Sequence, residues 1–382
     1  MPKLFMVVNE DRFFLSHRKP VAFAAKKAGY DVVIITKDTG QRQDIEDLGF
    51  ETVDLPIDPT GMNPQHEMKT FWFLLRLYRK ERPDIVHHVG LKNILWGGLA
   101  AKLVGIKGVV NAVSGLGSLF NKEGMTATTR TILSVMRFSN NRKRVRLIFQ
   151  NDDDKEIFIH HKVVKTDQIE FTHGSGIDLD EYSYIDAPAD DTIKVIFTAR
   201  MVKEKGVCDL IEAAESLKPE YHDKVRFILC GRLTPNKTGI SEEYMDMHCD
   251  GEYICWLGER DDIKELLERS HIMAFPSYYR EGVPKSLIEA AAIGRPIITC
   301  DSVGCRDVVD DGVNGFLIAP HDSRQLADAL RQLIDNPTLR HRMGKASRAK
   351  AEKDFPIEKV IRTHLNIYRD LSSWSGTAIN RP

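Results

Sequence analysis

Two glutamates with seven residues between them bracket the segment of the chain that has the clearest chemical character. Glu281 precedes a Gly-Val-Pro turn, and Glu289 lies in the Ala-rich helix that this turn is expected to open. Pro284 suits the first helical turn, where a missing N–H costs nothing. The backbone N–H groups of 283–286 would point outward from the positive end of the helix, which predicts an anion site suited to phosphate. Carboxylates beside such a cradle indicate a ligand with phosphates and hydroxyls, such as a nucleotide sugar. The alternative is a plain strand–turn–helix with two surface glutamates.

Two basic residues in the same half of the chain could meet a phosphate. Arg200 and Lys205 follow the apolar run 195–199, which predicts a strand, just as the run 271–275 predicts the strand before Glu281. In a parallel sheet, the loops after both strands open on the same edge. We therefore expect the two cations beside the anion cradle, although each by itself would also suit a solvated loop.

Composition limits the kind of protein that this chain can be. With 382 residues, 42% of them apolar and 29% charged, it is long enough for two soluble domains. The formal net charge of -1 gives no field that favours nucleic acid, so none is expected as a partner. The cysteines all lie in the second half without a CxxC pair, which predicts buried thiols in a reducing cytosol and no metal site.

Continuous apolar strands alternate with helices in both halves of the chain. This pattern predicts an α/β fold with parallel sheets that are covered on both faces. A polar stretch at 178–191 resembles a linker, and the alternation restarts at 195. The ligand is therefore expected in a cleft between two α/β halves.

Ligands of parallel sheets bind beyond the carboxyl ends of the strands, which selects the loops 9–18, 87–93 and 114–121 of the first half. The neighbours His87 and His88 suit a metal poorly, because adjacent strand residues point to opposite faces. They could instead line a cleft, with Lys92 close to a phosphate, or belong to ordinary surface. The glycines after Ser114 could bring backbone amides close to a ligand, but a simple turn fits equally well.

A helix with apolar and basic faces is predicted at 128–141, and it runs into the basic segment 142–146. Trp72 and Phe73, with Arg76 nearby, give a weaker signal of the same kind. The alternatives are a solvated helix end and contact with an anionic membrane surface. No apolar run approaches the roughly 20 residues of a membrane span, so any membrane contact is expected to be peripheral.

The chain resembles the retaining glycosyltransferases of family 4, whose GT-B fold consists of two Rossmann-like domains facing each other across a cleft. The resemblance covers nearly the whole chain. Its motifs are Thr198-Ala-Arg200-x4-Lys205-Gly206, Gly174-Ser-Gly-Ile-Asp178, Gly231, Leu257-Gly258, Glu281-x7-Glu289 and Gly312-x2-Gly315-Phe-Leu. Within the family, the chain is most similar to CapM and PglA-type enzymes, which build bacterial glycans on polyprenyl diphosphate. One departure is the first loop, which holds a Gly-Gly pair in many members and reads Asn9-Glu-Asp-Arg-Phe-Phe here.

The resemblance implies roles for individual residues. Arg200 and Lys205 would neutralise the departing diphosphate and Glu281 would lie at the transferred sugar, so these three are the expected catalytic residues. Glu289 would hydrogen-bond the ribose hydroxyls. The other expected donor-binding residues are Gly231, Arg232, Arg260, Gly282, Val283, Pro284, Lys285, Ser286 and Leu287. The expected acceptor-binding residues are His17, Arg18, His88, Lys92, Ser114, Gly115 and Gly117.

The resemblance further implies an N-terminal acceptor-binding domain at 1–172 and a C-terminal nucleotide-sugar-binding domain at 173–356. A last helix at about 357–382 would return to the first domain. The expected location is the cytoplasm, peripheral on the cytoplasmic face of the inner membrane.

The implied reaction is a retaining transfer of an N-acetylhexosamine, GalNAc or GlcNAc, from a UDP-sugar. The acceptor would be a polyprenyl-diphosphate-linked saccharide of a capsule, an O-antigen or a protein glycan. No cofactor or metal is expected, because Arg200, Lys205 and the helix end can balance the diphosphate charge. The alternatives are a UDP-sugar 2-epimerase of the same fold, a transferase with a soluble acceptor, and an inert nucleotide-sugar-binding scaffold.

Overall fold

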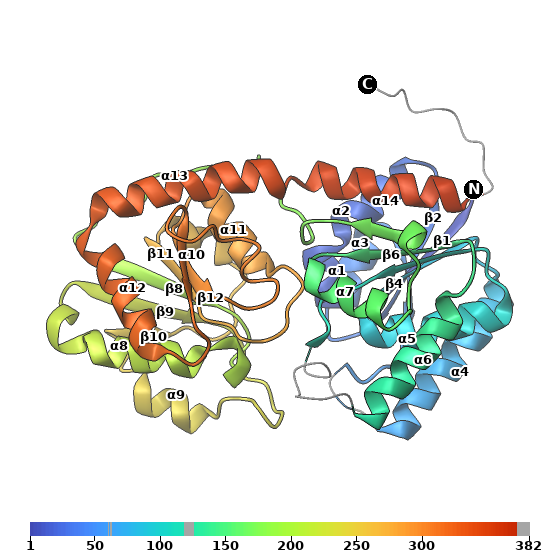
Figure 1. The fold of residues 1–382 in the computed structure, drawn as a ribbon, viewed down its shortest axis with the longest axis horizontal. Helices are drawn as coiled ribbons and strands as arrows, with labels where there is room; N and C mark the ends of the chain where they lie inside the picture. The colour runs from blue at the N-terminus through green and yellow to red at the C-terminus, as the bar shows by residue number, and fades with distance from the viewer. Residues whose placement is uncertain (60, 62, 118–125, 373–382) are drawn as a thin grey trace. The chain divides into compact units, whose positions relative to one another are not determined.

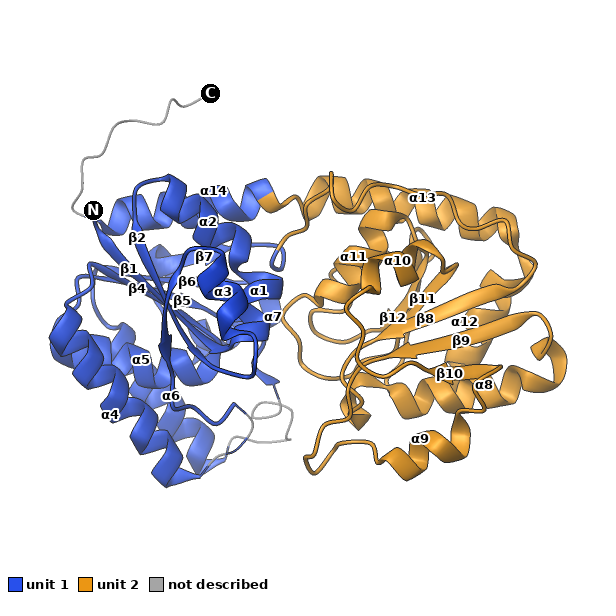
Figure 2. Ribbon diagram, turned by 180° about the vertical axis from the view of Figure 1, so that it is seen from behind, with its two compact units in different colours: residues 1–175, 358–382 blue, residues 176–357 orange. Residues whose placement is uncertain are grey.

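The chain folds into two compact units, one of residues 1–175 with those from 358 onward and one of residues 176–357 (Figure 2). A computed structural model describes residues 1–59, 61, 63–117 and 126–372. Each unit is a parallel sheet with helices around it, so the α/β fold with two Rossmann-like units predicted from the sequence is confirmed (Figure 1). The last helix, α14 (Ile357–Leu371), packs in the first unit. There the ring of Tyr368 makes edge-to-face contacts with the rings of Tyr30 and His87.

Seven parallel strands form the sheet of the first unit, in the order β3-β2-β1-β4-β5-β6-β7. The strands are β1 (Lys3–Glu10), β2 (Asp31–Lys37), β3 (Glu51–Asp54), β4 (Ile85–Val89), β5 (Gly108–Ala112), β6 (Val145–Phe149) and β7 (Ile169–Phe171). The helices are α1 (Asp11–His17), α2 (Lys19–Lys27), α3 (Arg42–Asp47), α4 (Pro64–Glu81), α5 (Leu91–Val104), α6 (Ala127–Asn140) and α7 (Asp152–His160). The strand order reverses between the neighbours β1 and β4, and such a reversal opens a crevice at the carboxyl ends of the strands.

Six parallel strands form the sheet of the second unit, in the order β10-β9-β8-β11-β12-β13. The strands are β8 (Ile193–Thr198), β9 (Val225–Cys230), β10 (Ile254–Trp256), β11 (Ile272–Phe275), β12 (Ile297–Cys300) and β13 (Gly315–Ile318). The helices are α8 (Val207–Tyr221), α9 (Glu242–His248), α10 (Ile263–Glu268), α11 (Lys285–Ile293), α12 (Ser323–Asp335) and α13 (Pro337–Asp354). Here the strand order reverses between β8 and β11.

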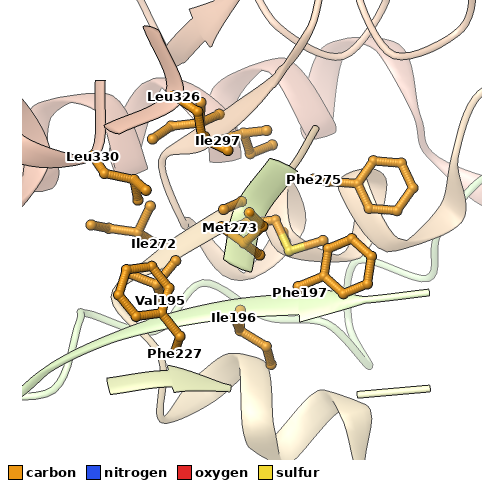
Figure 3. Packing of buried hydrophobic residues seen from close by; sticks show 14 of the residues in the cluster. Val195, Ile196, Phe197, Phe227, Ile272, Met273, Phe275, Ile297, Leu326 and Leu330 are labelled. Atoms are coloured by element: carbon orange, nitrogen blue, oxygen red, sulfur yellow. The ribbon is translucent and has the colours of Figure 1, made fainter. Parts of the chain in front are cut away.

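Burial on both faces explains why the central strands are apolar throughout. Every residue of β4, β5, β11 and β12 is buried. Figure 3 shows the core around β8 and β11, where Phe197 and Phe275 stack with their ring centroids 5.9 Å apart. The two strands that carry the expected catalytic loops are therefore fixed to each other by packing as well as by hydrogen bonds.

Three buried histidines indicate how the stability of the fold depends on pH. His88 and His364 have no exposed surface and His271 is 2% exposed. Burial lowers the pKa of His88 to about 4, that of His364 to about 3 and that of His271 to about 4. Below the ordinary histidine pKa of about 6.5, the unfolded chain therefore binds more protons than the folded chain does.

We therefore expect stability that is fully present above about pH 6.5 and that falls as the pH drops toward 4. At pH 5 the loss should be roughly 2 kcal/mol for each of these histidines. Urea unfolding at pH 7.5, 6 and 5 measures the free energy of unfolding directly. His88→Gln should flatten the profile, and a wild-type profile that is already flat over this range would contradict the expectation.

Candidate active site

A buried ion pair occupies the edge of the second sheet where the strand order reverses. Lys205 ends a short 3-10 helix, Lys203–Lys205, in the loop after β8, and Glu281 lies in the loop after the neighbouring β11. The Lys205 ammonium donates to Glu281 Oε1, and the two side chains are only 13% and 15% exposed. The ammonium also lies 5.2 Å from the centroid of the Phe275 ring. The structure thus brings together two of the three expected catalytic residues.

Backbone contacts hold the two loops against each other. The N–H groups of Tyr278 and Tyr279 both donate to the carbonyl oxygen of Glu204, at 3.0 Å each. Gly206 follows with a φ of 78°, and a Cβ atom at this position would lie 2.0 Å from the carbonyl oxygen of Pro276. Only glycine allows this approach, which explains the Lys-Gly pair of the sequence. The position of Lys205 is therefore fixed by both loops.

The turn between Glu281 and α11 forms the predicted anion cradle with one change. Pro284 occupies the N-cap, with a φ of −62° and a ψ of 125°, so the helix begins one residue later than the first turn predicted for this proline. Its carbonyl oxygen accepts from the N–H of Leu287 at 3.2 Å. The N–H of Ser286 has no hydrogen-bond partner in the described part of the chain and stands at the positive end of the helix. This end can therefore receive an anion.

The loop after β12 supports the cradle from behind. Gly304 has a φ of 83°, and a Cβ atom there would lie 1.5 Å from the carbonyl oxygen of Gly282. Ser302 Oγ donates to the carbonyl oxygen of Ser277 at 2.7 Å. The loop after β12 thus packs directly against the backbone of the cradle.

Glu289 lies about one turn into the same helix and is 12% exposed. The hydroxyl of Tyr182 donates to its Oε1 at 3.3 Å, and the Lys285 ammonium lies 3.5 Å from the same oxygen. Burial raises the pKa of this carboxyl, and the charge of Lys285 opposes the rise. A largely buried carboxyl that is held by a neighbouring hydroxyl suits hydrogen bonding to ligand hydroxyls.

Further donor-site candidates follow the neighbouring strands β8, β9 and β10 of the same sheet. Arg200 is exposed, and its side chain has no hydrogen bond or ion pair within the described ranges. Arg232 is half-buried after β9. Arg260 forms a two-pronged pair with Asp262, at 2.7 and 2.6 Å, which a ligand would have to share. Gly231 passes so close to the chain that a Cβ atom would lie 1.7 Å from the carbonyl oxygen of Ala199.

The structure corrects several acceptor residues predicted in the first unit. His88 is a core residue, because its ring lies 2.9 Å from the Tyr78 hydroxyl and 2.8 Å from Asn111 Oδ1. Lys92 uses its three N–H groups on Glu67 and on the carbonyl oxygens of Asp58 and Gly61, so none is left for a phosphate. His88 therefore does not line a binding surface, and the ammonium of Lys92 is already bound by protein partners.

Arg18 and His17 differ from each other although they are neighbours. Arg18 is 1% exposed, and burial lowers its pKa to about 10. The charge of Arg18 helps to lower the pKa of the buried His87 and His364. Arg18 therefore belongs to the interior of the first unit and not to a ligand-binding surface. His17 is half-buried and stacks on Phe13 with the ring centroids 4.1 Å apart. The sequence could not separate the two, because both belong to one helix–helix junction.

The loop after β5 remains a candidate for contact with a ligand. Gly115 and Gly117 have φ values of 101° and 60°, so both need glycine or a strained residue. Ser114 is half-buried. The part of the predicted loop after Gly117 lies outside the described residues. Among the residues that the structure covers, no group of three His, Cys, Asp or Glu side chains could hold a metal ion.

Comparison with known proteins covers both units. Residues 3–151 match the family described as glycosyl transferase 4-like, and residues 180–350 match glycosyl transferases group 1. The chain is 26% identical over 376 residues to the N,N'-diacetylbacillosaminyl-diphospho-undecaprenol alpha-1,3-N-acetylgalactosaminyltransferase of Campylobacter jejuni, covering 93% of this chain and 97% of that protein. It is 25% identical to the UDP-Gal:alpha-D-GlcNAc-diphosphoundecaprenol alpha-1,3-galactosyltransferase of Escherichia coli, covering 90% and 89%.

Solved structures agree with the fold. Anabaena Alr3699/HepE in complex with UDP and glucose superposes with a TM-score of 0.77 at 18% identity, over 98% of this chain and all of that one. The sucrose-phosphate synthase of Thermosynechococcus elongatus gives a TM-score of 0.77 at 18% identity, over 97% and 99%. At this identity the likeness concerns the fold alone.

Proposed function

This chain belongs to the glycosyltransferases that join a 4-like N-terminal region to a group 1 C-terminal region, and from that premise we propose its reaction. It transfers an N-acetylhexosamine, GalNAc or GlcNAc, from a UDP-sugar to a saccharide on polyprenyl diphosphate, with retention at the anomeric carbon. The observation that carries the proposal is the Lys205–Glu281 pair beside the α11 cradle. The names of the Campylobacter and Escherichia relatives support the lipid-linked acceptor.

The donor takes its place along one edge of the second sheet. Its diphosphate lies at the start of α11, where the N–H of Ser286 points outward, with Lys205 and Arg200 as the balancing cations. The ribose hydroxyls bind Glu289, and the uracil lies toward Arg232 and Arg260. The transferred sugar lies at Glu281, which the ion pair holds in position.

The chemical step breaks the bond between the anomeric carbon and the phosphate oxygen. The electron pair goes to the diphosphate, the acceptor hydroxyl attacks the anomeric carbon from the same face, and its proton moves to the departing phosphate. Negative charge grows on the diphosphate in the transition state, so preorganised cations and amides there lower the barrier most. No metal is required in this scheme, because Lys205, Arg200 and the helix end supply the positive charge.

Removal of the Glu289 carboxylate should weaken donor binding more than it slows turnover. A hydrogen bond to a charged group contributes about 1.5–3 kcal/mol, so Glu289→Ala should raise the Kd for UDP about 10- to 100-fold. Isothermal titration of UDP measures this change. Tyr182→Phe, which removes only the hydroxyl that orients the carboxylate, should have a smaller effect in the same direction. An unchanged Kd in Glu289→Ala would remove this residue from the donor site.

We propose that the enzyme meets an anionic membrane through the outer faces of α4 and α6. Trp72 is 48% and Phe138 54% exposed on these helices, next to the exposed Arg76 and Arg137. The predicted segment 142–146 suits this role less well, because Arg142 is half-buried and donates to the carbonyl oxygens of Ala101, Ile106 and Lys107. No helix in the described ranges has both the length and the apolar character needed to cross a bilayer.

Charge reversal on α4 tests this contact. Arg76→Glu combined with Arg79→Glu should weaken sedimentation with phosphatidylglycerol vesicles by tenfold or more, because each basic residue near such a surface contributes about 1 kcal/mol. Reversal of the exposed Lys345 on α13 is the matched control and should leave binding unchanged. Equal loss in both variants, or loss in neither, would argue against a membrane surface on α4.

A further inference from the structure

An apolar groove lies between the helices α4, α5 and α6 of the first unit, which pack side by side (Figures 1 and 2). Its volume is about 280 Å³. Leu91, Leu95 and Trp96 of α5 form one side, and Ile132 and Val135 of α6 form another. None of these residues belongs to the donor site, and the acceptor residues predicted from the sequence include only Lys92 of this groove.

The groove opens where ligands of this unit are expected. Each of the three helices follows a strand of the parallel sheet, so each begins at the carboxyl edge of the sheet. The lining residues come mainly from the first two turns of these helices, and Pro64 of α4, Leu91 of α5 and Thr128 of α6 are examples. Leu91 also follows β4 directly, at the point where the strand order reverses. A chain in the groove would therefore end near the crevice of the first sheet.

The two charged groups of the groove are paired with each other. Glu67 accepts from the Lys92 ammonium at 2.6 Å through one oxygen and from the Trp96 ring N–H through the other. Lys92 donates further to the carbonyl oxygen of Asp58 at 2.6 Å. The pair is electrically neutral and offers no cation to a phosphate. The interior of the groove is thus suited to hydrocarbon and not to the charged end of a ligand.

The surroundings of the groove are basic and aromatic. A neighbouring groove along α4 is lined by Lys69, Arg76 and Lys80 together with Trp72, and another on α6 by Arg130. Among the described residues that line these two neighbours, none is acidic. Of these basic residues, Lys69 and Arg130 lie in the first two turns of α4 and α6 and are exposed, so they put positive charge near the end of the groove that faces the sheet edge. An apolar groove with basic residues on the adjoining surfaces matches an amphiphile with a hydrocarbon chain and an anionic head.

We propose that this groove binds the isoprenoid chain of the carrier lipid next to its diphosphate. The inference rests on the proposed function and deepens it, because it assigns the recognition of the lipid to side chains of α4, α5 and α6. The chain lies against Leu95, Trp96, Ile132 and Val135, and its diphosphate lies at the sheet edge outside the groove. The enzyme then selects its acceptor by the lipid as well as by the sugar.

Binding of farnesyl diphosphate to the full chain tests the proposal without knowledge of the acceptor sugar. Isothermal titration in detergent-free buffer, with UDP present to occupy the donor site, compares farnesyl diphosphate with inorganic diphosphate. We expect at least tenfold tighter binding of the farnesyl compound, because each buried methylene contributes about 0.8 kcal/mol. Ile132→Trp fills the groove and should remove this difference. Ser134→Trp lies on the same helix outside the groove and should keep it.

Val135→Asp is a second groove variant, which places a charge in the groove instead of filling it. It keeps the test valid if Ile132→Trp fails to fold. Equal affinity of wild type for the two diphosphates would overturn the proposal, as would a farnesyl preference that survives in both groove variants. The proposed function has a separate readout. If transfer occurs equally well to farnesyl-linked and short-alkyl-linked acceptors, the groove proposal fails and the function stands. If farnesyl binding depends on the groove but no lipid-linked saccharide is ever glycosylated, the function fails and the groove stands.

Discussion

Lys205→Ala should lower kcat by about 10²- to 10³-fold, which corresponds to about 3 kcal/mol of lost transition-state stabilisation. The ammonium is largely buried beside the cradle, so its charge is poorly screened where the diphosphate departs. The loss should appear mainly in kcat, because charge on the leaving group grows in the transition state. Acceptor-dependent release of UDP under saturating donor measures it.

Two variants separate this effect from simple loss of the ion pair. Lys203→Ala removes an exposed lysine from the same 3-10 helix and should leave kcat within about twofold. Glu281→Gln keeps the shape of the partner side chain and leaves Lys205 in place, but it removes the charge of the partner. Its loss of activity should therefore include poorer positioning of the sugar as well as the loss of the ion pair. If Lys205→Ala and Lys203→Ala have the same kcat, Lys205 does not act on the leaving group.

Gly304→Ala should damage the donor site severely although Gly304 carries no side chain. A Cβ atom would lie 1.5 Å from the carbonyl oxygen of Gly282, so the cradle or the β12 loop must move. A 1 Å displacement of a positioned group costs about 10²-fold in rate, and we expect a loss in kcat/KM of at least that size. The Tm should fall as well.

Gly312→Ala provides the matched control for Gly304→Ala. Its φ of 73° is equally left-handed, but nothing lies within 4 Å of the added atom. It should cost only the local strain of about 1–2 kcal/mol and leave kcat/KM unchanged. Equal activity in the two alanine variants would show that contact between the β12 loop and the cradle is irrelevant to donor binding.

The edge of the second sheet could be predicted because its chemistry is local in sequence. Strand, turn and helix follow each other around Glu281, and parallel topology then brings Lys205 to the same edge. The sequence could not predict what the backbone packing adds. Gly304 supports Gly282 from another loop, and Tyr182, which holds Glu289, lies in a stretch interpreted as a linker.

The first unit was predicted less well, since burial decides whether a polar residue is available. His88 and Lys92 have the right position after a strand, but partners from α4 and from the segment before it occupy both of them. The helix α13 was not predicted, because few of its residues are buried in the described part of the chain, and Met343 is the only large apolar one among them, beside Gly344, Ser347 and Ala351. Most residues of α13 are themselves polar, so its sequence lacks the apolar stripe that is typical of a packed helix.

The most direct test of the account follows UDP-GalNAc and UDP-GlcNAc by NMR, with and without a polyprenyl-diphosphate-linked saccharide. We expect UDP to appear only when the lipid-linked saccharide is present, and the product to keep the anomeric configuration of the donor. Conversion of the sugar at C2 without any acceptor would instead identify an epimerase. If the protein binds UDP but releases none from UDP-sugars with any lipid-linked saccharide, it is not a transferase that acts on such acceptors.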